Sequence, residues 1–234
     1  MIDTILFDLD GTLLPYSQEA FIEVYISKLA KVFERLDMDP KASIEVVWAG
    51  TRAMAQNDGS MLNTQRFWQT FSEALEIPPE KLPLVEAACD DFYTNEFDTV
   101  KVVMEATSIP KELVEFMKEK GYTLVLATNP LFPQCAVTTR LNWIDLALSD
   151  FILATHYANS TYCKPNLGYY NEILSKINKE PAQCIMVGNN PTEDMVAGKL
   201  GMELFLVTDY LENESAMDIS GFPQGTLAQL ASIV

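Results

Sequence analysis

The sequence has 234 residues, of which 48% are hydrophobic, and its 33 acidic and 16 basic residues give a formal net charge of −17. This length suits one core domain with a smaller insertion, and the acidic excess argues against general binding to nucleic acids or anionic membranes. Because the chain would repel an anionic substrate at long range, a phosphate site in it must supply its own cations, either as a metal ion or as a lysine.

The chain opens with an apolar segment of strand length, residues 4–7, which leads directly into Asp8-Leu9-Asp10-Gly11-Thr12. At a strand end that turns through a glycine, two carboxylates two residues apart can converge on one site. Such a pair suits phosphoryl transfer, because Asp8 can attack as a covalent nucleophile while Asp10 protonates the leaving alcohol and later deprotonates water. The alternative is a structural turn with a helix cap, which aspartate and glycine commonly form.

Several segments with helical periodicity follow, and Ser17 is placed to cap the first of them. They are residues 17–36, 40–55, 64–75 and 79–93. We interpret residues 17–96 as an all-helical cap inserted into the core. Arg52 and Arg66 are its candidate substrate contacts, and plain solvation at the surface is the alternative for both.

The rest of the chain alternates strand-length apolar runs with helical segments, a pattern typical of a parallel sheet covered by helices. The expected strands are 123–127, 151–154, 184–187 and 203–207, and the expected helices are 111–120, 133–141, 167–177 and 192–200. We therefore predict an α/β fold, in which residues 1–16 and 97–234 form a core around a parallel sheet.

Ligands of an open parallel sheet bind outside the carboxyl ends of the strands, and polar residues follow several of the expected strands. Thr128 and Asn129 offer neutral hydrogen-bond donors for phosphate oxygens, and Lys164 supplies a fixed positive charge. Carboxylates gathered around a phosphate repel it unless a counterion is present, so we expect Mg²⁺ as cofactor.

Taken together and in order, these elements resemble the haloacid dehalogenase-like superfamily. Residues 8–12 match its first motif, Thr128 the second, Lys164-Pro165 the third, and residues 188–194 match the spacing of the fourth. The resemblance implies a Rossmann-like core with a helical cap directly after the first motif, as in phosphoglycolate phosphatase-like members. It also argues against carbon–halogen cleavage, because dehalogenases lack a carboxylate at the position of Asp10.

The resemblance further implies a metal site, for which we assign Asp8, Asp10, Asn189 and Asp194. Asn189 departs from the family pattern, which usually has an aspartate there. An asparagine carbonyl can still bind Mg²⁺, but it removes one negative charge from the coordination sphere.

The sequence thus predicts a phosphatase that hydrolyses a small-metabolite phosphate monoester through an aspartyl-phosphate, with Asp8, Asp10, Thr128 and Lys164 as the catalytic residues. A sugar-phosphate mutase and, because of Asn189, a catalytically weak binding or regulatory protein are the alternatives. The four cysteines form no C-x-x-C pair, Met1 is not followed by a leader, and no apolar run approaches 18 residues. We therefore expect a reduced, soluble, cytoplasmic protein with no nucleic-acid or membrane partner.

Overall fold

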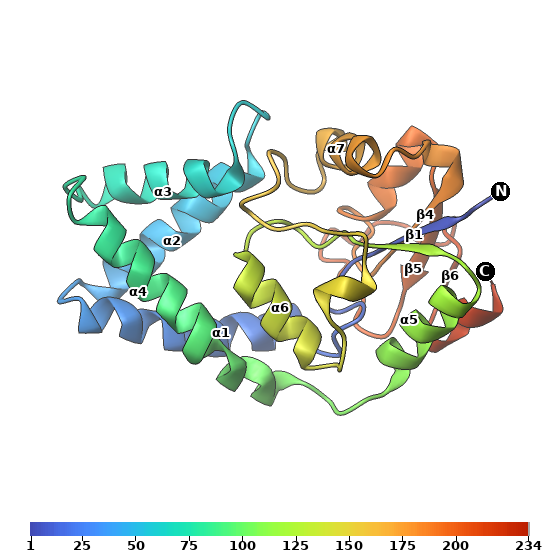
Figure 1. Cartoon of the computed structure of the whole chain (residues 1–234), viewed down its shortest axis with the longest axis horizontal. Coiled ribbons are helices and arrows are strands. Elements are labelled where there is room, and N and C mark those ends of the chain that lie inside the picture. The colour runs from blue at the N-terminus through green and yellow to red at the C-terminus, as the bar shows by residue number, and fades with distance from the viewer. Residues whose placement is uncertain (234) are drawn as a thin grey trace.

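A computed structural model describes residues 1–233 and confirms the predicted α/β class; residue 234, the last of the predicted core, lies outside the described residues (Figure 1). Six parallel strands form one sheet in the order β3-β2-β1-β4-β5-β6. They are β1 (Thr4–Phe7), β2 (Thr123–Leu126), β3 (Leu153–Ala154), β4 (Cys184–Gly188), β5 (Glu203–Val207) and β6 (Gln224–Gly225). The sequence did not predict β6, because its two residues carry no apolar pattern.

The central position of β1 places its carboxyl end beside the ends of two other strands. Phe7 lies opposite Leu126 of β2 and opposite Val187 of β4. The residues that follow these three positions, including Asp8, therefore leave the sheet at one edge.

Alternate side chains of β1 enter two different apolar clusters, as the pleat of a strand requires. Ile5 and Phe7 pack on the face covered by α5 (Ile109–Glu119), whereas Leu6 packs on the face covered by α7 (Leu167–Ile177). Figure 1 shows these two helices on opposite sides of the sheet.

Four helices fill the segment predicted as a cap: α1 (Gln18–Arg35), α2 (Pro40–Ala55), α3 (Asn63–Ala74) and α4 (Leu82–Asn95). The Ser17 hydroxyl accepts a hydrogen bond from the amide of Ala20 and so caps α1, as expected. Figure 1 shows these helices together at the end of the molecule away from both termini. The division into a core and a cap over residues 17–96 stays a proposal.

Two segments differ from the sequence prediction. The expected helix at residues 192–200 is instead a short 3₁₀ helix, Met195–Leu200, which ends at Gly201 with a left-handed φ of 96°. A further 3₁₀ helix, Phe97–Val103, returns the chain from α4 towards α5. Neither segment has enough residues of helical period for the sequence to distinguish a 3₁₀ helix from an α-helix or a loop.

The cap helices and one face of the sheet share a single apolar cluster. It runs from Phe7 through Phe21 and Tyr25 of α1 to Phe92 of α4 and Phe97. Helix α6 (Gln134–Asn142) lies between the two parts and adds Ala136, Val137 and Leu141 to the same cluster. The cap is therefore docked on the core through apolar contacts as well as through its chain connections.

Asn63, the first residue of α3, also fixes the cap to the core. It is fully buried, and its backbone amide donates to the carbonyl of Ser160 at 2.9 Å. Its side-chain nitrogen donates to the carbonyls of Pro130 and Tyr162, at 3.4 and 3.3 Å. These bonds join the start of α3 to two core loops.

We predict that Asn63→Ala lowers the free energy of unfolding by about 1–3 kcal/mol, because two core carbonyls lose a buried donor. Asn95→Ala is the matched control, since the exposed Asn95 side chain bonds only Asp91 on its own helix, at 2.7 Å. Urea denaturation of both variants measures the difference. Equal stability of the two would show that the Asn63 side chain does not hold the cap.

Candidate active site

A buried lysine lies between two carboxylates at the carboxyl edge of the sheet. Lys164 Nζ donates to Asp8 Oδ1 at 2.7 Å and to Asp194 Oδ1 at 2.6 Å. The Lys164 and Asp194 side chains are each 1% exposed and that of Asp8 is 10% exposed. Asp8 follows β1, Lys164 lies in the loop before α7, and Asp194 precedes the 3₁₀ helix after β4. The group therefore joins three loops, and it carries one net negative charge when both carboxylates are ionised.

Burial controls the protonation of this group. It raises the pKa of Asp8 to about 8, against the opposing effect of the Lys164 ammonium. Burial alone would lower the pKa of Lys164, but the Asp194 and Asp8 carboxylates raise it well above its ordinary value. Lys164 is therefore charged at neutral pH, and a second cation beside Asp8 would favour the carboxylate form that a nucleophile needs.

Asn189 lies next to Asp8, and Thr12 links them. The Thr12 hydroxyl lies 3.2 Å from both Asp8 Oδ2 and Asn189 Oδ1. Asn189 Nδ2 donates to the carbonyl of Tyr210 at 2.6 Å, which directs the amide oxygen towards Thr12. A Cβ at Gly11 would lie 2.2 Å from that nitrogen, and Gly11 has a φ of +75°, so this turn requires glycine.

The oxygens of Asp8, Asn189 and Asp194 fit a hard divalent cation. Carboxylate and amide oxygens are ligands that Mg²⁺ accepts, and the net negative charge of the buried group favours a cation. Within residues 1–233, no group of three or more His, Cys, Asp or Glu side chains is arranged to hold a metal. A site here therefore needs the neutral oxygen of Asn189 and oxygens from water or substrate.

The Asp10 side chain lies outside this group because it has a cation of its own. Arg140 of α6, whose side chain is fully buried, donates from Nη1 to Asp10 Oδ1 at 2.8 Å and to Oδ2 at 2.6 Å. The Tyr16 hydroxyl also donates to Oδ1, and burial raises the pKa of Tyr16 so that it keeps its proton. This geometry orients Asp10 but gives no support to its carboxylate as a metal ligand.

Thr128 and Asn129 lie where the sequence places them, directly after β2. The carbonyl of Thr128 accepts hydrogen bonds from the hydroxyls of Thr155, at 2.6 Å, and Tyr169, at 2.8 Å. Asn129 Oδ1 accepts from the amide of Lys164 at 3.3 Å, and its Nδ2 donates to Glu193 at 3.1 Å. Asn129 therefore ties together the loops that follow β2, β3 and β4.

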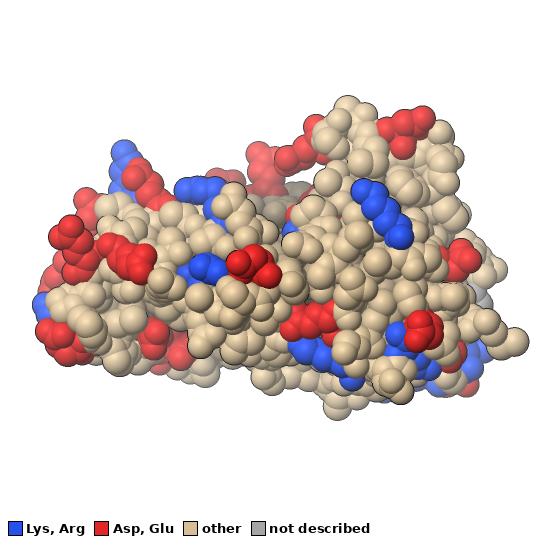
Figure 2. All heavy atoms as spheres, turned by 90° about the horizontal axis from the view of Figure 1, so that it is seen from above, with Lys and Arg blue, Asp and Glu red and all other residues tan. Residues whose placement is uncertain are grey.

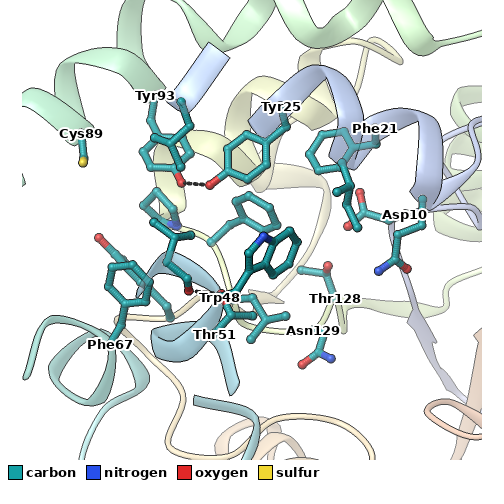
Figure 3. Close-up of a pocket in the computed structure, with 18 of the residues that line it drawn as sticks. Asp10, Phe21, Tyr25, Trp48, Thr51, Phe67, Cys89, Tyr93, Thr128 and Asn129 are labelled. Atoms are coloured by element: carbon teal, nitrogen blue, oxygen red, sulfur yellow. Dashed lines mark hydrogen bonds between the residues drawn. The ribbon is translucent and has the colours of Figure 1, made fainter. Parts of the chain in front are cut away.

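A cavity of about 180 Å³ lies between this edge of the sheet and the cap. Figure 3 shows Asp10, Thr128 and Asn129 at one end, Phe67, Cys89 and Tyr93 at the other, and Trp48 between them. Asp8, Asn189 and Asp194 also line the cavity. The predicted core residues therefore converge on one enclosed space, with Lys164 directly behind Asp8.

The two cap arginines do not line this cavity. Arg52 is exposed, and Arg66 Nη2 lies 3.4 Å from Asp58 and 3.2 Å from Ser60 on the cap surface. This geometry does not support the predicted contact of Arg52 and Arg66 with substrate, because Arg52 is solvated and Arg66 contacts other residues on the cap surface.

Arg140 and Glu212 were missed by the sequence reasoning. The only local signal for Arg140 is a charge within an otherwise apolar helical segment, beside Val137 and Leu141. Glu212 lines the cavity, its amide donates to the carbonyl of Asn189 at 3.0 Å, and burial raises the pKa of its carboxyl to about 7. It lies beyond the motifs in a loop after β5, where the sequence offers no pattern.

Comparison with known proteins shows the family of the chain. The family model for haloacid dehalogenase-like hydrolases matches residues 2–201. The curated ribulose-1,5-bisphosphate 5-phosphatase of Halopiger xanaduensis is 24% identical over 92% of this chain and 88% of its own.

Solved structures share the fold. A 2-haloacid dehalogenase from Pseudomonas syringae superposes with a TM-score of 0.66 at 18% identity, over 100% of this chain and 98% of its own. A magnesium-bound HAD hydrolase from Bacillus subtilis superposes with a TM-score of 0.59 at 18% identity, over 99% of this chain and 98% of its own. The chain belongs to the haloacid dehalogenase-like hydrolase family, as its motifs predicted. No helix within residues 1–233 is long and apolar enough to cross a bilayer.

We predict that Arg140→Met destabilises the protein by about 3–5 kcal/mol, because it leaves Asp10 without its cation. In a double-mutant cycle, Asp10→Asn should restore part of this loss, since the pair then carries no charge. Lys118→Met is the control, because the Lys118–Asp150 pair, at 2.7 Å, is partly exposed. Chemical denaturation measures each variant, and strictly additive effects of Arg140→Met and Asp10→Asn would contradict the pairing.

Proposed function

We propose that this chain is a magnesium-dependent phosphatase that hydrolyses a small phosphate monoester through an aspartyl-phosphate. The observation that carries the proposal is the position of Asp8, held by Lys164 at the end of a cavity beside Thr128 and Asp10. The phosphatase activity of the curated relative supports the same reaction class.

In the first step a carboxylate oxygen of Asp8 attacks phosphorus, and the ester P–O bond breaks. Asp10, protonated at this stage, gives its proton to the leaving alcohol. In the second step water attacks the same phosphorus, Asp10 takes the proton from water, and the acyl phosphate bond breaks to release phosphate and free Asp8. Arg140 and Tyr16 orient the Asp10 carboxylate, the form that takes the proton from water, since both donate hydrogen bonds to it in the structure.

The charges around the cavity explain the need for a metal. Six carboxylates line it, those of Asp8, Asp10, Asp90, Glu193, Asp194 and Glu212, and no lysine or arginine does so within the described residues. Asp8, Asn189 and Asp194 would hold Mg²⁺, which would supply the positive charge that a phosphoryl group needs against these carboxylates. Thr128 and Asn129 add neutral donors, and Lys164 acts from behind Asp8.

Asn189 keeps one alternative open, a weakly active binding protein with the same fold. Its neutral amide lowers the charge of the metal site, and the same assay that tests hydrolysis distinguishes the two. We place either activity in the cytoplasm, since all four cysteines are free thiols, as is usual in a reducing compartment.

We predict that Asp8→Asn abolishes phosphate release from phenyl phosphate, because a neutral amide does not attack phosphorus. The parent protein should release phosphate in Mg²⁺ and lose this activity in excess EDTA. Glu45→Gln, an exposed change on α2, serves as the matched acid-to-amide control. Turnover by Asp8→Asn at the parent rate would exclude the aspartyl-phosphate route.

We predict that Asp10→Asn lowers kcat by roughly 10²–10⁴-fold for alkyl phosphates, the range typical of general acid–base catalysis. The loss should be smaller for 4-nitrophenyl phosphate, because its phenolate leaves without a proton. Steady-state kinetics on both esters provide the comparison. An equal loss on the two would contradict the role of Asp10 as the acid.

A further inference from the structure

The end of the cavity away from Asp8 is built from apolar and aromatic side chains. Phe33, Val47, Phe67, Phe71 and Tyr93 line it, and all come from the cap. The Phe67 and Phe71 rings stack with centroids 5.9 Å apart. Figure 3 shows Phe67 and Tyr93 facing the same space that Thr128 closes at the other end.

Three hydroxyl groups in this region already have partners. The Tyr25 and Tyr93 hydroxyls lie 2.6 Å apart and bond each other, and the Thr51 hydroxyl donates to the carbonyl of Val47 at 2.9 Å. A leaving group rich in hydroxyls would therefore lose hydrogen bonds to water that these three hydroxyls do not replace.

Positive charge is also missing where a second anionic group would lie. The cations near the cavity, Lys164 and Arg140, are buried against Asp8, Asp194 and Asp10. Asp90 adds a carboxylate on the cap side. Figure 2 shows acidic side chains over both the cap and the core on the face it presents, so the surface adds no strong attraction for anions.

The volume of about 180 Å³ includes the end at Asp8, so a phosphoryl group there leaves room for about one ring. An apolar protein cavity of about 150 Å³ is enough to bind benzene. A phenyl or branched alkyl group therefore matches the apolar end of this space.

We propose, building on the proposed function, that the substrate is a phosphate monoester with an uncharged, mainly apolar leaving group about the size of one ring. The phosphoryl group meets Asp8 and Thr128, and the alkyl or aryl part lies among the cap aromatics, where burial of apolar surface supplies the binding free energy. A substrate with a second phosphate, as the name of the curated relative states for that protein, would have no cation for it here.

The first test compares matched esters that differ in charge. Phenyl phosphate should have a kcat/KM at least about tenfold higher than that of 4-carboxyphenyl phosphate, because the added carboxylate is desolvated beside Asp90 and the aromatic rings. The carboxyphenolate is slightly the better leaving group, so chemistry alone favours the opposite order. 3,3-Dimethylbutyl phosphate should likewise exceed phosphocholine, its cationic isostere.

The second test changes the cavity. Trp48→Ala should lower kcat/KM for phenyl phosphate at least about tenfold while changing that for methyl phosphate much less, because only the larger group contacts the indole. Glu45→Ala, an exposed residue of the same helix, should leave both values unchanged.

The outcomes separate this inference from the proposed function. Hydrolysis of the charged esters as fast as the neutral ones, or faster, would overturn the apolar leaving group while leaving the phosphatase reaction in place. A preference for phosphocholine over its neutral isostere would do the same and would indicate cation–π recognition. If none of these esters is hydrolysed in the presence of Mg²⁺, both the proposed function and this inference are wrong.

Discussion

The ammonium of Lys164, buried between Asp8 and Asp194, is the interaction on which the site depends. Each carboxylate follows a different strand, and neither could be buried there without a shared cation. Because the parallel register brings these strand ends to one edge, one lysine contacts both carboxylates, and one negative charge remains for a metal when both are ionised. Fold and chemistry therefore depend on the same contact.

The sequence predicts best those helices and strands whose formation is determined by residues close together in the chain. Strands 4–7 and 203–207 and helices 40–55 and 167–177 match the structure, since each has a complete apolar pattern and a clear boundary. Asp8, Thr128, Lys164 and Asp194 follow from motif order. Arg140 could not be found in this way, because it meets Asp10 across 130 positions through the packing of α6. The position of the two cap arginines outside the cavity could not be predicted for a related reason: a charge on a helix has no pattern that shows which way the side chain turns.

The acidity of the chain has different consequences at long and short range. The net charge of −17 repels phosphorylated compounds at long range. Inside the cavity, what matters is whether a lysine or arginine is left unpaired to bind an anionic group. Lys164 and Arg140 are paired with Asp8 and Asp10, the carboxylates of the proposed site, and so neither is free to bind a substrate. What remains for recognition is apolar surface, which does not depend on salt as attraction between opposite charges does.

The hydrogen bond from Asn189 to the backbone carbonyl of Tyr210 ties the choice of residue at 189 to the conformation of that loop. An aspartate at 189 would place a carboxylate oxygen where the amide nitrogen now lies, 2.6 Å from that carbonyl, and the two oxygens would repel. The loop at Tyr210 would have to turn its carbonyl away before the acid could be accommodated. A change to aspartate at 189 is therefore expected only together with a different backbone conformation at Tyr210.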